Sequence, residues 1–243
     1  MRLKISHLLQ IHVSGHLPWG IQMFFNEPRE PIRVAVMSAH PDDETLGAGG
    51  TLAKHAAFGD EIHVCVVTTA YTPDWPEEAL QLSHAQAMEA LKCLGIQDVS
   101  FLQFPTVKLN AVPGKELNDR IADFINKVDP QVVYAPFPGD LNSDHGIVAR
   151  STAIAVRPVA GTRRSLLYFE TLSSTEWGRM FLQSSFVPNL YVDICSTLEL
   201  KLKAASCYDL EIRQFPHPRS IEDIKTLAKL RGMESALNAA EAF

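Results

Sequence analysis

The sequence has no long apolar run, no excess of basic residues and no closely spaced pair of cysteines. No stretch of the 243 residues approaches the roughly 20 consecutive apolar residues that a transmembrane helix needs, which argues against a membrane-spanning protein. The 22 Lys and Arg residues are outnumbered by 28 Asp and Glu residues, so a nucleic-acid partner, which requires a basic face, is not expected. The hydrophobic content of 46% is enough to bury the core of one α/β domain.

The four cysteines are far apart and form no C-x-x-C pair: Cys65, Cys93, Cys195 and Cys207. Cys65 lies in an apolar, strand-like run, and Cys93 lies in an apolar helical segment. This pattern is typical of buried, reduced cysteines in a cytoplasmic protein, and we do not expect them to bind a metal.

Residues 1–31 are predicted to be an N-terminal extension of uncertain order. Polar residues interrupt its mildly apolar segment and no small-residue cleavage site follows, so we predict a packed extension or a mobile arm rather than a signal peptide. Residues 32–243 are predicted to form a single domain.

Strand-like and helix-like segments alternate through this domain. The predicted strands are residues 34–39, 62–69, 99–104, 132–135, 166–170 and 190–193. The predicted helices are residues 45–58, 77–94, 117–128, 146–156, 197–208 and 221–240. Repeated β-α alternation implies an α/β fold, a Rossmann-like three-layer sandwich with a mostly parallel sheet and helices on both faces.

The segment Ser38–Glu44 places one His, two Asp and one Glu at the end of a predicted strand. Burying so many ionisable groups is costly unless something compensates them, and a divalent metal would do so. His40 and Asp43 are three residues apart across a stiffening proline, and imidazole and carboxylate are ordinary Zn²⁺ ligands. The alternative is a helix N-cap, in which Asp42 or Asp43 caps the helix that begins near Thr45.

A second apolar run, residues 132–135, is followed by a loop that ends in Asp144 and His145. Loops at the same ends of two parallel strands face one another across a crevice, where ligands bind in open α/β sheets. His40, Asp43 and His145 would then supply three ligands and leave one position for water, which is the pattern of a catalytic zinc site.

The chain resembles the PIG-L/LmbE family of zinc-dependent deacetylases from about Ile32 to its C-terminus. The resemblance rests on Ala39–Glu44 (AHPDDE), Leu46–Ala53 (LGAGGTLA), Asp140–His145 (DLNSDH), Leu230–Gly232 (LRG) and Ala240–Phe243 (AEAF), the last two resembling a closing helix.

This resemblance implies hydrolysis of an N-acetyl group on an amino sugar or sugar conjugate. Zinc in the predicted site would lower the pKa of water toward about 7. Asp42, beside a metal ligand, is the natural general base. Asp144 is expected to orient a ligand, and Glu44 is expected to be a charge at the helix N-terminus rather than a ligand.

Many family members carry His at the position of Asn142, and that His is thought to help hold the oxyanion. An Asn amide can donate a hydrogen bond but carries no positive charge. Either Asn142 suffices or another cation helps, and His217 is the candidate. The alternative for His217 is a solvent-exposed loop residue.

Thr175, Glu176 and Trp177 follow a predicted strand and offer the hydroxyl, carboxylate and indole groups that a sugar pocket uses. The alternative is an ordinary loop with a half-buried Trp. The glycines Gly47, Gly49 and Gly50 are interpreted as sites of close helix packing rather than as a phosphate-binding loop.

The leading hypothesis is therefore a zinc-dependent sugar N-deacetylase. The alternatives are an amidase that acts on another conjugated amide and a non-catalytic metal-binding relative. Another divalent metal such as Fe²⁺ could replace zinc, depending on its availability. The sequence leaves the particular sugar and the oligomeric state open, although family members are often homo-oligomers.

Overall fold

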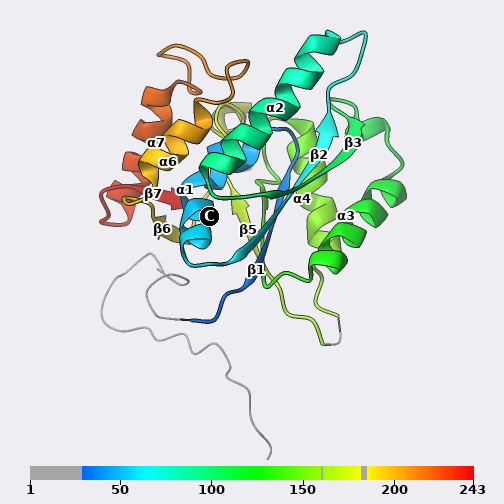
Figure 1. Cartoon of the computed structure of the whole chain (residues 1–243), viewed down its shortest axis with the longest axis horizontal. Helices are drawn as coiled ribbons and strands as arrows, with labels where there is room; N and C mark the ends of the chain where they lie inside the picture. Colours follow the sequence, from blue (N-terminus) through cyan, green and yellow to red (C-terminus); the bar gives the residue numbers. More distant parts are fainter. Residues whose placement is uncertain (1–28, 160, 182–184) are drawn as a thin grey trace, which may run out of the picture.

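The computed structural model describes residues 29–159, 161–181 and 185–243, so residues 1–28 of the predicted extension lie outside the described residues. A parallel sheet of five strands lies at the centre, in the order β3-β2-β1-β4-β5 (Figure 1). Its strands are β1 Arg33–Ser38, β2 Glu61–Thr69, β3 Asp98–Pro105, β4 Val132–Pro136 and β5 Ser165–Phe169. A separate antiparallel pair is formed by β6 Tyr191–Asp193 and β7 Ala240–Ala242.

Helices cover both faces of the central sheet (Figure 1). The helices are α1 Asp43–Ala57, α2 Glu77–Cys93, α3 Gly114–Val128, α4 Ser143–Ala155, α5 Thr175–Phe181, α6 Leu198–Ala205 and α7 Ile221–Glu234, with a 3₁₀ turn at Leu109–Ala111. Buried side chains of α1, α2, α6 and α7 share one hydrophobic core, and those of α3 and α4 share a second core on the opposite face. The result is the three-layer α/β fold predicted from the sequence.

Strand alternation explains the two cores. In β1, Val34 and Val36 contribute to the core under α1, whereas Ala35 and Met37 contribute to the core under α3 and α4. Successive side chains of a strand point to opposite faces, and here both faces are apolar because helices cover both. This is why the strands appear in the sequence as continuous apolar runs.

The C-terminal part differs from the prediction. The last helix was expected to continue to Ala240, but α7 ends at Glu234 and residues 240–242 form β7. The chain reverses because Ala236 adopts a left-handed conformation (φ 59°) and the Leu237 amide donates to the Gly232 carbonyl oxygen. Only glycine fits at position 232, since a Cβ there would lie 2.6 Å from the Leu237 oxygen.

The glycines of α1 pack closely, as predicted. A Cβ on Gly47 would lie 2.1 Å from the Phe169 ring of β5, and one on Gly50 would lie 2.8 Å from Ile194 Cγ2. The prediction of buried cysteines holds for Cys65 in β2 but is wrong for Cys195, which is exposed at the end of the short strand β6.

A buried ion pair joins the C-terminal strand to α1. The Glu241 carboxylate accepts hydrogen bonds from the backbone amides of Gly50 (2.9 Å) and Thr51 (2.7 Å) in the middle of that helix. Lys201 of α6 donates to the same carboxylate at 2.6 Å and to the Leu46 carbonyl oxygen at 2.8 Å. Because both charged side chains are almost fully buried, each depends on the other for compensation.

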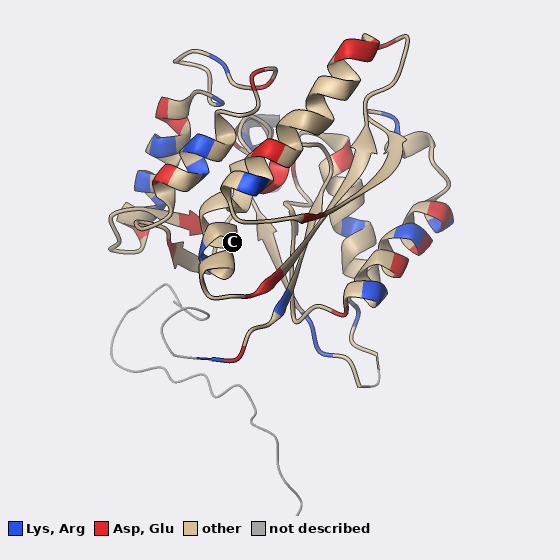
Figure 2. Ribbon diagram, in the orientation of Figure 1, with Lys and Arg blue, Asp and Glu red and all other residues tan. Residues whose placement is uncertain are grey.

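Helices α3, α6 and α7 each carry charged residues of both signs (Figure 2). Within the described ranges, no helix is both long enough and apolar enough to cross a membrane.

Replacing Glu241 by Gln should lower the free energy of unfolding by about 3 kcal/mol, because it leaves Lys201 as an uncompensated buried cation. Chemical denaturation followed by circular dichroism measures this change. The matched control is Glu199→Gln, which alters an exposed ion pair to Lys225 and should change stability by less than about 0.5 kcal/mol. Equal effects of the two substitutions would contradict the structural role of the buried pair.

Candidate metal centre

The first half of the site is the turn between β1 and α1. The strand ends at Ser38, and α1 begins at Asp43, so His40 lies in the intervening turn. Asp42 occupies the N-cap position, but its side chain makes no capping hydrogen bond. The predicted alternative, in which Asp42 serves as a simple cap, is therefore wrong, and its carboxylate is left for another interaction.

The second half is the loop between β4 and α4. Asn142 caps α4, since its side-chain Oδ1 accepts a hydrogen bond from the Asp144 amide at 3.0 Å. His145 lies in the first turn of this helix and is fully buried. Strands β1 and β4 are neighbours in the sheet. From β1 the chain adds strands first on one side, as β2 and β3, and then on the other, as β4 and β5. Ligands bind at such a switch point in folds of this kind.

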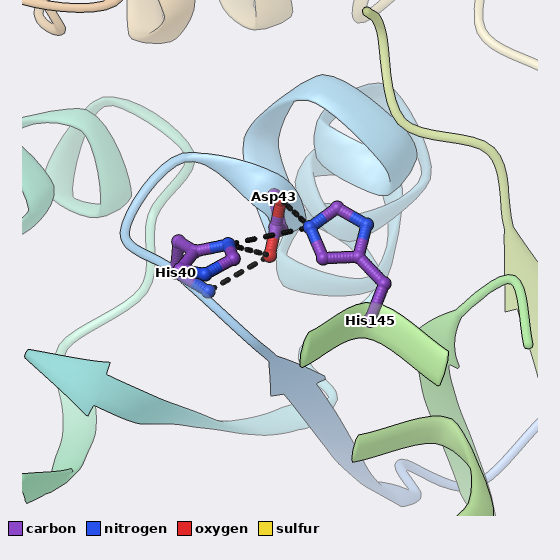
Figure 3. Close-up of side chains that lie close together, drawn as sticks. All are labelled: His40, Asp43 and His145. Atoms are coloured by element: carbon purple, nitrogen blue, oxygen red, sulfur yellow. Dashed lines mark hydrogen bonds and ion pairs between the residues drawn. The ribbon is translucent and has the colours of Figure 1, made fainter. Parts of the chain in front are cut away.

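Three side chains from these two loops converge (Figure 3). Potential ligand atoms of His40, Asp43 and His145 all lie within 4.8 Å of one another. His145 Nε2 lies 3.2 Å from Asp43 Oδ1 and 3.3 Å from His40 Nδ1. His40 Nδ1 lies 3.6 Å from Asp43 Oδ2. The two loops predicted to face one another therefore do so.

Each of these side chains is oriented by a second group. His145 Nδ1 forms a 2.7 Å hydrogen bond with Asp140 Oδ2, which directs Nε2 toward Asp43. His40 Nε2 is bonded in the same way to Asp144 Oδ2 at 3.1 Å. Asp43 Oδ2 accepts the His40 backbone amide at 2.8 Å. Carboxylate partners of this kind fix the tautomer of a metal-binding imidazole and increase its basicity.

The electrostatics of the site favour a cation. Burial alone would lower the pKa of both imidazoles, but neighbouring carboxylates, Asp144 and Asp43 for His40 and Asp43 and Asp140 for His145, outweigh it. They raise the pKa of His40 to about 9 and that of His145 to about 10. Burial would raise the pKa of Asp43, yet the adjacent His145 and His40 hold it well below its usual range. The site thus attracts positive charge, either protons or a metal ion.

The donor set fits a metal ion. Asp43 Oδ1 is buried and has no hydrogen-bond partner in the described part of the chain, although it lies beside His145 Nε2. A buried carboxylate oxygen without a hydrogen bond is costly, and a divalent cation would satisfy it. Two imidazole nitrogens and one carboxylate oxygen match the three-ligand pattern of catalytic zinc sites.

The Asp42 carboxylate lies beside this group and is paired with Arg219. Asp42 Oδ2 accepts a hydrogen bond from Arg219 Nη1 at 2.8 Å. Burial raises the pKa of Asp42 well above its usual range, Arg219 opposes that shift, and the neighbouring Asp43 adds to it.

The backbone at two positions of the site is strained. Asp42 has φ 121°, and Val107, whose amide donates to Asp144 Oδ2 at 2.7 Å, has φ 59°. Residues other than glycine rarely adopt such backbone conformations. Each costs about 1–3 kcal/mol, and they cluster at functional sites.

The predicted substrate residues lie on α5, a short helix that was not among the helices predicted from the sequence. Thr175 Oγ1 accepts the Thr171 amide at 2.8 Å and so holds the local turn. Both carboxylate oxygens of Glu176 are buried without a hydrogen-bond partner among the described residues. Trp177 is 41% exposed, and its ring meets His217 edge-on at 5.7 Å between centroids.

His217 and Glu44 lie outside the three-ligand group. His217 Nδ1 accepts the Arg219 amide at 3.1 Å, so only Nε2 remains available on that ring. Glu44 is fully buried and accepts hydrogen bonds from three hydroxyl groups, those of Ser38, Thr45 and Tyr208. Glu44 thus belongs to a buried hydroxyl network rather than serving only as a helix-terminal charge.

Two residues of the site, Asp140 and Arg219, were given no role in the predictions from the sequence. Asp140 begins the Asp140–His145 motif, and its position five residues before His145 could have indicated its role. Arg219 gave no such signal, because it lies 177 residues from Asp42 along the chain.

The structure is an α/β fold in which three potential metal ligands converge at the switch point of a parallel sheet. Residues 35–156, half of the chain, match the PIG-L family, described as GlcNAc-PI de-N-acetylase. The chain belongs to this family.

Two relatives by sequence are named as sugar deacetylases. The chain is 30% identical over 176 residues to 1D-myo-inositol 2-acetamido-2-deoxy-alpha-D-glucopyranoside deacetylase of Actinosynnema mirum, covering 60% of this chain and 61% of that protein. It is 25% identical over 202 residues to diacetylchitobiose deacetylase of Thermococcus kodakarensis, covering 79% of this chain and 73% of that protein. The chain thus matches less than two thirds of the Actinosynnema protein.

Solved structures share the fold. A conserved protein of Thermus thermophilus superimposes with a TM-score of 0.71 at 24% identity, covering 87% of this chain and 93% of that one. The 4-carboxy-2-hydroxymuconate hydratase GalB of Pseudomonas putida superimposes with a TM-score of 0.69 at 21% identity, covering 87% and 94%. Since this fold also carries a hydratase, the activity must be argued from the site.

Replacing Asp140 by Asn should weaken zinc binding by about 10–100-fold, because His145 loses the carboxylate that orients it and raises its basicity. Competition with a chromophoric chelator measures the zinc Kd. The matched control is Asp98→Asn, which alters a His–Asp hydrogen bond of the same length, to His63, far from the site in the sheet. A wild-type zinc affinity in the Asp140 variant would show that His145 needs no such partner.

Proposed function

We propose that this protein is a zinc-dependent hydrolase that removes an N-acetyl group from an amino sugar or a sugar conjugate. The observation that carries the proposal is the group formed by the half-buried His40 and the buried Asp43 and His145, with the Asp42 carboxylate beside it. Membership of the PIG-L family and the names of the sequence relatives support the same reaction and the same class of substrate.

His40 Nδ1, His145 Nε2 and Asp43 Oδ1 are the atoms that would hold the metal. The chemistry that zinc supplies in such a site is Lewis-acid activation of water and of a carbonyl group. Zinc is preferred for the mixed nitrogen and oxygen donors, and Fe²⁺ is the alternative where it is more available.

Asp42 is the proposed general base. It takes a proton from the attacking water and passes it to the amine that leaves, so that the sugar amine and acetate are the products. Only Oδ2 of Asp42 has a hydrogen-bond partner among the described residues, which leaves Oδ1 to accept the proton.

Asn142 is the proposed donor to the oxyanion. Its Oδ1 caps α4, so the side-chain NH₂ group is the part that can donate to a developing negative charge. His217 has only Nε2 left for the same role, because its Nδ1 is bonded to the Arg219 amide.

The substrate contacts are proposed to come from α5. Trp177 offers a partly exposed ring for the apolar face of a sugar. The buried Glu176 oxygens, which have no hydrogen-bond partner among the described residues, would accept hydrogen bonds from sugar hydroxyl groups once the side chain turns toward the substrate. Thr175 contributes by holding the turn that presents them.

Residues 32–243 form one domain, and a cytoplasmic location agrees with free thiols at all four cysteines. The oligomeric state is left open by the sequence, and light scattering on the purified protein tests whether it is a homo-oligomer.

The proposed function is tested by measuring zinc content and acetate release from a panel of N-acetylated sugars. Wild-type protein should release acetate in a metal-dependent manner, and His145→Ala should lose both zinc and activity. Asp42→Asn should retain zinc but lose turnover by about 10²–10⁴-fold, the usual contribution of a general base. The control Asp123→Asn, on the exposed face of α3, should behave like the wild type.

Full activity of the Asp42 variant would exclude it as the base. Stoichiometric zinc with no acetate from any sugar would favour the alternative of a conjugated amide substrate. Failure on conjugated amides as well would indicate a non-catalytic metal-binding protein.

A pH dependence of KM should follow from Glu176. Burial, with nearby Asp140 and Glu170 adding to it, raises the pKa of Glu176 to about 7. A raised pKa means that the carboxylate is ionised only above about pH 7, so KM should rise as the pH falls through that value. In Glu176→Gln, KM should be about fivefold higher at pH 8, a loss of about 1 kcal/mol, and independent of pH.

Steady-state kinetics between pH 6 and about pH 8.5 check this. Glu222→Gln, in the exposed first turn of α7, is the matched control and should keep the wild-type profile. The same pH profile in Glu176→Gln as in the wild type would rule out Glu176 as a substrate contact.

A further inference from the structure

Arg219 places a guanidinium group against the proposed base from a distant part of the chain. It lies in the segment between α6 and α7, immediately before the α7 N-cap Ser220. Its Nη1 donates to Asp42 Oδ2 at 2.8 Å and to Glu211 Oε2 at 2.8 Å. Its Nε donates to the Leu172 carbonyl oxygen at 2.8 Å. The guanidinium is therefore held by three acceptors from three separate segments.

The backbone of Arg219 is fixed as well. Its amide donates to His217 Nδ1 at 3.1 Å, and its carbonyl oxygen accepts the Arg213 amide at 3.2 Å. The next residue, Ser220, caps α7 through its side chain, which accepts the Asp223 amide at 3.0 Å. A side chain mounted on a helix terminus in this way can position a partner more accurately than one on a free loop.

Asp42 needs such a partner more than most carboxylates do. It is 2% exposed, it lies next to the carboxylate of Asp43, and its backbone is strained at φ 121°. Its side chain makes no bond to the helix that it precedes. Without Arg219, no hydrogen bond among the described residues would fix the direction of the Asp42 carboxylate.

We propose that Arg219 is a positioning residue for the general base. By binding Oδ2 of Asp42 it turns Oδ1 toward the attacking water. This inference rests on the proposed function, because the base acts only if the protein is a hydrolase. The guanidinium group affects the reaction through the Asp42 carboxylate and not through contact with the substrate. Its loss should therefore lower kcat rather than weaken substrate binding.

The first test uses the full-length, zinc-loaded protein and the best N-acetylated sugar found for the wild type. Arg219→Met should lower kcat by about 10–100-fold, as removal of an orienting partner does, with KM within about twofold of the wild type. Arg219→Lys should recover part of the loss, and millimolar guanidinium should restore part of the activity of Arg219→Ala. The matched control is Arg213→Met in the same segment. Its guanidinium donates to the backbone carbonyl oxygens of Leu210 and Ile212, and the variant should keep wild-type kinetics.

Wild-type kcat in Arg219→Met would overturn the proposal, as would a raised KM with unchanged kcat, which would make Arg219 a substrate contact. Zinc content and thermal midpoint are measured on every variant. If Arg219→Met does not fold, the activity of Arg219→Lys and the effect of guanidinium on Arg219→Ala decide the question. Absence of recovery in both would overturn the proposal.

Crystal structures of the zinc-bound wild type and of Arg219→Met or Arg219→Lys provide a test that needs no activity. A rotated or disordered Asp42 carboxylate in the variant supports the positioning role. An unchanged carboxylate overturns it. If the wild type releases no acetate from any substrate, the proposed function fails, while these structures still decide whether Arg219 positions Asp42.

Discussion

The structure depends on compensating the negative charge that is buried where β1 and β4 end. Asp42, Asp43 and Asp144 all lie there with little or no exposure to solvent. Carboxylates so close together are tolerated only when cations or hydrogen-bond donors neutralise them. The two imidazoles, Arg219 and the metal that the donor atoms fit together provide this compensation.

This constraint explains how the outer parts of the fold are arranged around the sheet. The segment after α6 returns to the carboxyl ends of the strands and delivers Arg219 to Asp42. The C-terminal strand returns to the opposite side of α1, where Glu241 meets the amides in the middle of that helix. Helix α1 carries Asp43 in its first turn, so both contacts bear on the helix that presents a metal ligand.

Much of the fold and the centre of the site could be predicted from the sequence because their signals are local. Continuous apolar runs marked the strands, and His40, Asp43 and His145 lie in short motifs directly after two of them. Arg219 could not be predicted, because its partner is 177 residues away and its neighbours resemble an ordinary loop. His217, two residues earlier, drew attention instead. The strand β7 has only three residues and no alternating pattern, so it was interpreted as the end of a helix.

The ion pair between Lys201 and Glu241 has a consequence for the order in which the protein matures. Glu241 is synthesised after all the residues of the candidate metal site. Its carboxylate nevertheless accepts hydrogen bonds from amides in α1, the helix that begins with Asp43. A nascent chain that has not yet released this strand from the ribosome holds Lys201 without its anion. Helix α1, which carries Asp43 in its first turn, is therefore expected to gain its full set of contacts only after residues 240–242 have left the ribosome.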